Sequence, residues 1–287
     1  MYDVTLHGAK LHFVDDGFTS LPYVYRPLEQ GHVYEQVFLE HIRSMDRAGV
    51  YVDVGAHLGT HTVWFATLCP SSQVHAFEPV RRYADVVRRN VEVNHLTRKV
   101  VVHDIGLSDT PGEATNYLSP EHQMGFVDGD PEGVNETFQV MRLDDVIHGP
   151  VAVIKLDVEG MEPSVIRGAR RILSRHRPAV YAEALTDEAA RSVKAALAPF
   201  GYQATGLVFN SSPTYEYLAP PRSGIEHLRW LWNHIPTPVR TALGAATVAS
   251  RLPGHTRLGE GLLGAYRLLL PKRLRLRVRA VRRRMGH

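Results

Sequence analysis

Short apolar runs alternate with longer amphipathic stretches through the middle of the chain. Five runs predict buried strands: Val50–Val54, Val74–Phe77, Val100–His103, Val151–Leu156 and Ala179–Glu183. The helical stretches between them are Thr60–Leu68, Arg81–Asn94 and Glu162–Arg175. Continuous apolar runs are typical of parallel strands that are buried on both faces. The pattern therefore predicts an α/β fold, a mostly parallel sheet with helices on both faces.

The flanking residues extend this core. Residues 1–48 predict an N-terminal cap of short strands, with a helix near Val33–Met45 that leads into the first core strand. A helix near Asp187–Pro199 and two strands, Tyr202–Phe209 and Thr214–Leu218, would bring the sheet to seven strands.

The segment Asn116–Phe138 is rich in Gly, Asp, Glu, Asn and Pro, and predicts a long loop or an irregular hairpin. After Pro220 the composition changes to tryptophans, prolines and an arginine-rich end. We therefore expect three parts: the cap 1–48, a ligand-binding catalytic domain 49–219, and an appended segment 220–287.

The net charge of +3 is unevenly distributed. Eleven lysines and arginines lie in residues 251–287, against the single acid Glu260, so the rest of the chain is acidic. This disfavours a nucleic-acid-binding core. The apolar segment Leu262–Leu270, followed by a polybasic stretch, suits peripheral attachment to anionic lipid, and a disordered soluble tail is the alternative.

The cysteine content, the length of the apolar runs and the N-terminal residues bear on the cellular compartment of the protein. A single cysteine, Cys69, argues against a disulfide framework or a multi-cysteine zinc site and favours a reducing compartment. No apolar run reaches membrane-spanning length, and Met1–Lys10 lacks the pattern of a secretory signal. We expect a cytoplasmic protein, with peripheral contact at the inner membrane face as the alternative that the basic tail suggests.

The first core strand ends in an acid and a glycine turn. Asp53 closes the strand, and Gly55, Ala56, His57 and Gly59 precede the helix. Glycines allow a ligand to approach the backbone, and the helix N-terminus offers unpaired N–H groups. The spacing is not G-x-G-x-x-G, and the bulkier His57 suits a ligand without a phosphate there. An ordinary strand-to-helix turn is the structural alternative.

Acids also follow the next strands. Glu78 lies 25 positions after Asp53, where a carboxylate can accept both hydroxyls of a ribose. Asp157 and Glu183 end the fourth and fifth runs, and Glu159 follows in the turn, so we expect these three acids at one edge of the sheet. They would orient a substrate hydroxyl, accept its proton or hold a divalent cation, with Asp157 and Glu183 as its ligands.

Neighbouring polar residues have simpler explanations. We expect Lys155 to pair with one of these carboxylates, and Glu162 to lie at a helix N-terminus, where the macrodipole favours an acid. His57 and His61 flank the glycine turn, and either could be a general base. With 16 histidines in the chain, structural roles are favoured.

Together these residues resemble the FkbM family of S-adenosylmethionine-dependent O-methyltransferases. The matching stretches are Tyr51–Gly59, Ala76–Pro79, Gly106–Asp109 with Gly112, Leu143–Asp145, Lys155–Glu162 and Val165–Ala169, and Glu183 matches as well. The family usually has Asn where this chain has His57.

This resemblance implies a Rossmann-like class I methyltransferase fold. It also implies that the Asp53–Gly59 turn holds the methionine end of S-adenosylmethionine, that Glu78 holds the ribose, and that the strand end Asp104–Gly106 borders the adenine.

Members that this chain resembles methylate hydroxyls of sugars and secondary metabolites, and the acid-lined edge favours a sugar or glycoconjugate. We expect the acceptor over the edge formed by the cap and the Asn116–Phe138 loop. Asp157, Glu159 and Glu183 would act there directly or through Mg²⁺.

Three rival functions are weaker. An RNA methyltransferase is disfavoured because the chain has no Asn-Pro-Pro-Tyr motif and its basic residues lie outside the catalytic body. The retained carboxylates argue against a non-catalytic nucleotide-binding module, and the missing pyrophosphate glycines against a nicotinamide dehydrogenase. Whether the chain forms an oligomer, for example through residues 220–287, stays open.

Overall fold

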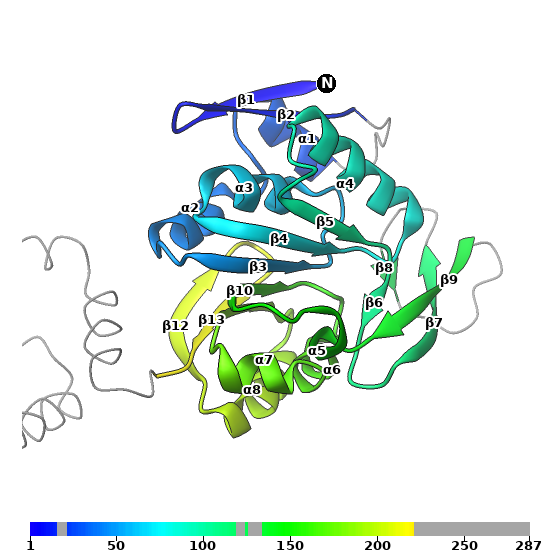
Figure 1. Cartoon of the computed structure of the whole chain (residues 1–287), viewed down its shortest axis with the longest axis vertical. Coiled ribbons are helices and arrows are strands. Elements are labelled where there is room, and N and C mark those ends of the chain that lie inside the picture. Colours follow the sequence, from blue (N-terminus) through cyan, green and yellow to red (C-terminus); the bar gives the residue numbers. More distant parts are fainter. Residues whose placement is uncertain (16–21, 119–123, 126–133, 221–287) are drawn as a thin grey trace, which may run out of the picture. The chain divides into compact units, whose positions relative to one another are not determined.

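A seven-stranded sheet lies at the centre of the described protein (Figure 1). The computed structural model describes residues 1–15, 22–118, 124–125 and 134–220. The strand order is β12-β13-β11-β10-β3-β4-β5. The bounds are β3 Gly49–Val54, β4 Ser71–Phe77, β5 Val100–His103, β10 Val151–Leu156, β11 Ala179–Glu183, β12 Gln203–Phe209 and β13 Thr214–Leu218. The strands from β11 to β5 are parallel, and β13 and β12 are antiparallel, which confirms the predicted fold class.

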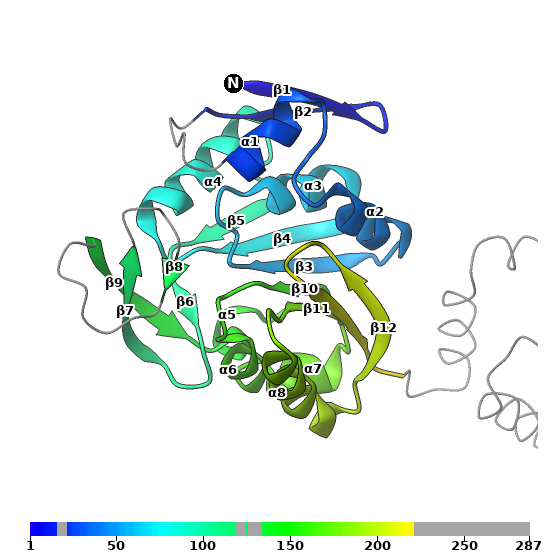
Figure 2. The ribbon, with the colours of Figure 1, turned by 180° about the vertical axis from the view of Figure 1, so that it is seen from behind.

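Helices cover both faces of this sheet (Figure 2). On one face lie α2 Gln36–Ser44, α3 Thr60–Leu68 and α4 Arg81–Val93, and on the other α5 Leu143–Val146, α6 Glu162–Arg167, α7 Arg170–Arg175 and α8 Asp187–Leu197. Side chains alternate along each strand, so Tyr51 packs under α2 and α3 while Val52 packs under α5–α8. The central strands are thus buried on both sides, as their continuous apolar sequence predicted.

The N-terminal residues pack onto the α2–α4 face. They form the hairpin of β1 Tyr2–Leu6 and β2 Ala9–Phe13, followed by α1 Pro22–Glu29. Leu11 and Phe13 are buried with Trp64 of α3, and the side chain of Asn90 on α4 accepts a hydrogen bond from the backbone of Val14. The predicted short strands and the helix near Val33–Met45 are present, whereas α1 was not predicted. Met1–Pro220 form one compact unit.

Two predicted elements differ from the structure. The helix expected over Glu162–Arg175 is two helices that meet at Gly168, where an added Cβ would lie 2.2 Å from the Ser108 carbonyl oxygen. This close approach places the β5–β7 connection against the helices.

The expected loop Asn116–Phe138 overlaps a hairpin of β7 Gly112–Leu118 and β9 Val134–Met141. With β6 Gly106–Leu107 and β8 Met124–Gly125 it forms a separate sheet of order β6-β9-β7-β8. The hairpin alternative was therefore the right one, with strands that extend beyond both predicted limits.

The predictions about residues 221–287, including the basic lipid-binding tail, lie outside the described residues. Within the described ranges, no helix is both long and apolar enough to cross a membrane.

Candidate functional site

The carboxyl ends of β3, β10 and β11 present polar side chains on one face of the sheet. Each of these polar residues comes two positions after a side chain that packs under α2 and α3. Asp53 follows Tyr51, Lys155 follows Val153, and Glu183 follows Tyr181. Because side chains alternate along a strand, all three face the same helices. The ladder aligns Lys155 with Asp53, so the sheet itself brings these groups together.

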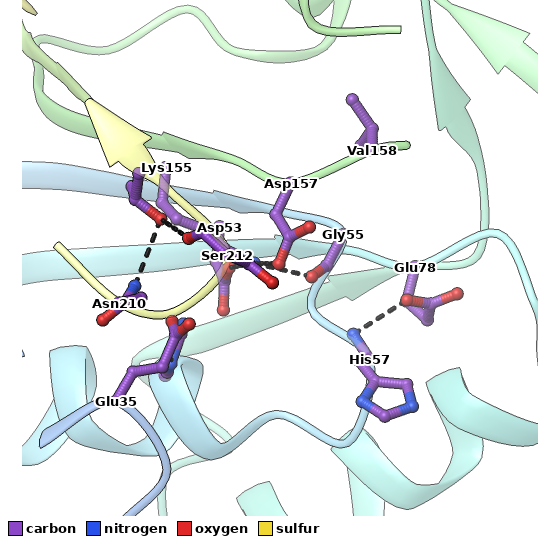
Figure 3. A network of polar contacts seen from close by, with 12 residues as sticks. Glu35, Asp53, Gly55, His57, Glu78, Lys155, Asp157, Val158, Asn210 and Ser212 are labelled. Atoms are coloured by element: carbon purple, nitrogen blue, oxygen red, sulfur yellow. Dashed lines mark hydrogen bonds and ion pairs between the residues drawn. The ribbon is translucent and has the colours of Figure 1, made fainter. Parts of the chain in front are cut away.

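Lys155 is the cation at the centre of this group (Figure 3). Its Nζ donates to the Gly55 carbonyl at 2.8 Å and lies 3.3 Å from both Asp53 Oδ1 and Asp157 Oδ2. Burial alone would lower the pKa of Lys155, but the charges of Asp157 and Asp53 outweigh it and raise the pKa. Lys155 is thus held protonated, and its predicted pairing with the carboxylates is confirmed.

Asp53 is a structural anchor rather than an exposed acid. Its side chain is fully buried, and its Oδ2 accepts a hydrogen bond of 2.6 Å from Thr62 on α3. The carboxylate therefore ties the end of β3 to the first turns of α3, on either side of the glycine turn.

The glycine turn has a backbone that other residues would not adopt. Gly55 has φ +75°, and a Cβ there would lie 1.8 Å from the Asp157 carbonyl oxygen. Gly59 has φ +78° and directly precedes α3, where a Cβ would lie 3.0 Å from Val87. His57 is also left-handed, at φ 51°. Both positions therefore require glycine, because the backbone is left-handed there and because an added Cβ would crowd a neighbouring residue.

Glu78 is held by the backbone of the turn. Its Oε2 accepts from the His57 N–H at 2.8 Å and its Oε1 from the Val80 N–H at 3.0 Å (Figure 3). Burial raises the pKa of this carboxyl to about 7, although the two N–H groups act in the opposite direction. The acid is thus fixed against the turn with its side chain fully buried, and its ribose-binding role stays a prediction.

The half-buried imidazole of His57 packs edge-on against Tyr83, with ring centroids 4.6 Å apart. Burial lowers its pKa to about 4, so the ring is neutral near neutral pH.

Three carboxylates meet at the ends of β10 and β11. One oxygen each of Asp157, Glu159 and Glu183 lies within 4.8 Å of the others, and Asp157 and Glu183 are hydrogen-bonded. Burial and the Asp157 charge raise the pKa of Glu183 to about 8. Burial would raise the pKa of Asp157 too, but the Lys155 charge keeps it below its usual value. The pair therefore holds one proton near neutral pH, with Asp157 as the anion.

An apolar cavity adjoins these acids. It encloses about 610 Å³, partly open to solvent. Its walls come from the ends of β3 and β4, from β6, from the β7–β9 hairpin and from the turn after β10: Val54, Gly55, Phe77, Pro79, Ile105, Gly106, Leu107, Ala114, Phe138, Val140, Asp157, Val158, Glu159 and Met161. Four predicted site residues, Gly55, Gly106, Asp157 and Glu159, thus line one cavity.

Asp104 is less well placed than expected. It does not line this cavity, and its half-exposed side chain lies 3.3 Å from Arg88 on α4. The neighbouring Gly106 has a packing role as well, because a Cβ there would lie 2.7 Å from the Phe138 ring.

Sequence analysis missed a polar group on the cap. Glu35 precedes α2 with φ 57°, and its Oε2 lies 3.4 Å from Nε2 of the buried His61. Burial raises the Glu35 pKa to about 7, and the charges of Lys155 and Asp157 act on it. Tyr34 stacks on His61 with ring centroids 6.0 Å apart. None of the matching stretches in the sequence includes this group.

Two other motif acids have structural roles. Asp109 forms an ion pair with Arg167, which links the segment after β6 to α6. Asp144 accepts hydrogen bonds from the backbone N–H groups of Arg171 and Ile172 in the first turn of α7. These residues explain why the Gly106–Asp109, Leu143–Asp145 and Val165–Ala169 stretches occur together.

This sheet, with a glycine turn after β3, an acid after β4 and a cavity at the strand ends, defines the chain as a Rossmann-like methyltransferase-type domain. Residues 53–203, just over half of the chain, match the Methyltransferase FkbM domain. The chain therefore belongs to the FkbM methyltransferase family.

Individual relatives are more distant. The chain is 25% identical over 186 residues to methyltransferase sdnD of Sordaria araneosa, a match that covers 51% of this chain and 71% of that protein. It is 34% identical over 99 residues to the AMB antimetabolite synthetase AmbE of Pseudomonas aeruginosa, covering 32% of this chain.

Among solved structures, the FkbM methyltransferase of Methylobacillus flagellatus aligns with 72% of this chain at 19% identity and a TM-score of 0.47. The matches span 4% of the synthetase and 56% of that solved chain.

Proposed function

We propose that this protein is an S-adenosylmethionine-dependent O-methyltransferase that methylates a hydroxyl of a sugar, glycoconjugate or secondary metabolite. The observation that carries the proposal is the position of Asp157. Its side chain is 37% exposed, lines the apolar cavity beside Gly55, and is hydrogen-bonded to Glu183. A proton acceptor thus lies at the boundary between the apolar cavity and solvent.

The cavity and turn fit S-adenosylmethionine. Gly55 lines the cavity, which suits the methionine end, and Glu78, held by the His57 N–H, would offer a carboxylate to the ribose hydroxyls. Phe77, Ile105 and Leu107 give the cavity apolar walls for an adenine ring. Among the described residues that line the cavity, none is a lysine or arginine, as expected for a cofactor without phosphates.

When bound, this cofactor supplies an activated, electrophilic methyl group. The residues of the chain then have to orient the acceptor hydroxyl and remove its proton. Asp157 accepts that proton, and Lys155 keeps Asp157 ionised until it does. Glu183 and Glu159 lie beside Asp157 and orient the acceptor by hydrogen bonds to its other polar groups.

We propose that these carboxylates act directly. Lys155 already provides a cation 3.3 Å from Asp157 Oδ2, which reduces the need for a second one. The three acids are also oxygen donors of the kind that Mg²⁺ binds. Activity that disappears in excess EDTA and returns with MgCl₂ would show that the metal-assisted alternative is correct.

The cofactor assignment is tested by calorimetric titration with S-adenosylhomocysteine. We expect micromolar binding that is lost in Glu78→Ala, because that substitution removes the ribose acceptor. Glu92→Ala, an exposed acid on α4, is the matched control and should bind like the wild type. NADH should not bind. Binding of NADH in place of S-adenosylhomocysteine would contradict the proposal.

A further inference from the structure

A second hollow lies between α2 and the turn that joins β12 to β13. It encloses about 910 Å³, much of it open to solvent. The lining residues are His32, Glu35, Gln36, Val37, Glu40 and Asn210. Five of the six side chains are polar and none is a lysine or arginine, so its chemistry differs from that of the apolar cavity.

The hollow connects to the catalytic carboxylates through two of its walls. Asn210 donates a hydrogen bond of 3.1 Å to Thr214, and the β11–β13 ladder pairs Thr214 with Glu183. On the opposing wall, Glu35 lies close enough to Lys155 and Asp157 for their charges to act on its pKa. Figure 3 draws Glu35, Asn210, Lys155 and Asp157 within one network of polar residues. Asp157 lines the apolar cavity, Glu35 lines the hollow, and the charge of Asp157 acts on Glu35, so the two spaces lie on either side of these acids.

The polar groups of the hollow are not equally available to a ligand. Glu40 is already bound by His7 and Arg43, at 2.6 and 2.9 Å. The side-chain oxygen of Gln36, Oε1, accepts a hydrogen bond from the Val33 N–H. This leaves the side-chain N–H groups of Gln36 as donors.

Glu35 is the acid that remains. Its neighbour His61 is 5% exposed, and Nε2 of that ring makes no hydrogen bond within the part of the chain that the structure describes. A buried, unsatisfied imidazole is costly unless a bound group completes its hydrogen bonding.

We propose that this hollow is the acceptor site and that it takes a neutral sugar unit. The inference rests on the proposed methyl transfer and adds the charge class of the acceptor. Sugar hydroxyls donate to Glu35 and to the Asn210 carbonyl oxygen, and accept from the Gln36 amide. An acidic acceptor would bring its charge next to Glu35 with no lysine or arginine in the lining to balance it.

A thiol placed in the hollow tests this without knowledge of the natural acceptor. Val37→Cys introduces a thiol into the wall of the hollow without removing a polar group, and the native Cys69 is buried. We expect a neutral methanethiosulfonate to label this thiol at least tenfold faster than an anionic one, after correction for their rates with free cysteine. Adding Glu35→Gln should narrow that ratio, whereas Glu92→Gln should leave it unchanged. Equal corrected rates would overturn the proposal.

Ligand protection gives the second readout. Methyl β-D-glucopyranoside at 50 mM should slow labelling by the neutral reagent severalfold, and methyl glucuronide at the same concentration should not. Equal protection by both, or none by the glucoside, would contradict the inference.

Titration of the wild type and of the Val37→Cys protein with S-adenosylhomocysteine distinguishes failure of the proposed function from failure of the acceptor site. Loss of cofactor binding in the wild type as well would refute the proposed function. Normal cofactor binding with unselective labelling would refute the acceptor site alone.

Discussion

Lys155 is the residue on which the site depends most. It is buried, and its ammonium group lies between Asp53 and Asp157. Sequence analysis predicted a pairing with one carboxylate, and the structure shows two together with the Gly55 carbonyl. One side chain therefore holds the ends of β3 and β10 and the glycine turn in a fixed relation.

Lys155→Met should lower the free energy of unfolding by about 3–5 kcal/mol, because it leaves two carboxylates without their cation in a buried site. Urea unfolding followed by circular dichroism measures the change. Lys99→Met is the control, since Lys99 makes one hydrogen bond to the Ala66 carbonyl and should cost about 1 kcal/mol. Equal losses in the two variants would refute the structural role of Lys155.

Glu35 should make stability depend on pH. Its pKa is raised to about 7 in the folded protein by burial, against an ordinary value of 4.5, so folding favours the protonated carboxyl. The stability that this proton contributes is fully present below pH 4.5 and is lost as the pH rises to about 7. Lys155, Asp157, Asp53, Tyr34 and His61 surround the group and act on the same equilibrium.

Glu35→Gln should therefore become more stable relative to the wild type as the pH rises from 5 to 8. Urea unfolding at each pH gives the difference between the two proteins. A difference that stays constant over this range would show that Glu35 ionises in the fold as it does in water.

At the scale of elements, the sheet was the most predictable part. The predicted limits of β5, β10, β11 and α3 agree with the structure, because buried parallel strands and their crossover helices carry strong apolar signals. The β7–β9 hairpin was less predictable. The strand β7, Gly112–Leu118, is largely polar, and apolar and polar residues do not alternate regularly along it. The break at Gly168 depends on Ser108, which is distant in sequence.

The β3–α3 turn should not tolerate any side chain at Gly55. Gly55→Ala combines a left-handed φ with a Cβ 1.8 Å from the Asp157 carbonyl oxygen, so the backbone must move. We expect a loss of about 3 kcal/mol or more, together with loss of S-adenosylhomocysteine binding.

Gly8→Ala separates the two causes. Gly8 has a similar φ of +80° in the β1–β2 turn, but an added Cβ there meets nothing within 4 Å. This variant should lose only about 1 kcal/mol, the cost of a left-handed alanine. Equal losses for both glycines would mean that conformation alone, and not the approach of Asp157, sets the requirement at Gly55.

At the scale of the whole molecule, we expect the described core to bind the cofactor and the basic segment to contact the membrane. The three hydrophobic clusters of the described chain are built from residues between Val4 and Ala219. We propose that the protein is cytoplasmic and that the polybasic residues after Lys272 give peripheral contact with anionic lipid, each charge contributing about 1 kcal/mol near the surface.

A form ending at Ala249 should bind S-adenosylhomocysteine like the full chain but should no longer float with phosphatidylserine-containing vesicles. High salt should also release the full-length protein, because the attraction is electrostatic. Equal flotation of both forms would remove the membrane proposal.

The sequence by itself determined the sheet, its helices and the position of the acids along it. These features depend on local apolar periodicity and on the rule that parallel strands carry ligands at their carboxyl ends. It also identified Glu78 and Asp157, since each directly follows a strand.

Only the tertiary structure decided how these residues act. It brings Glu35 of the cap close enough to Lys155 and Asp157, 120 and 122 positions later, for their charges to act on it, and it places Asn210 of the β12–β13 turn in the same hollow as Glu35; no local pattern encodes these relations. It also leaves Asp104 beside Arg88 and shows Lys155 shared between two acids. Pairing and burial depend on the packing of distant segments, and they set which carboxylate is charged.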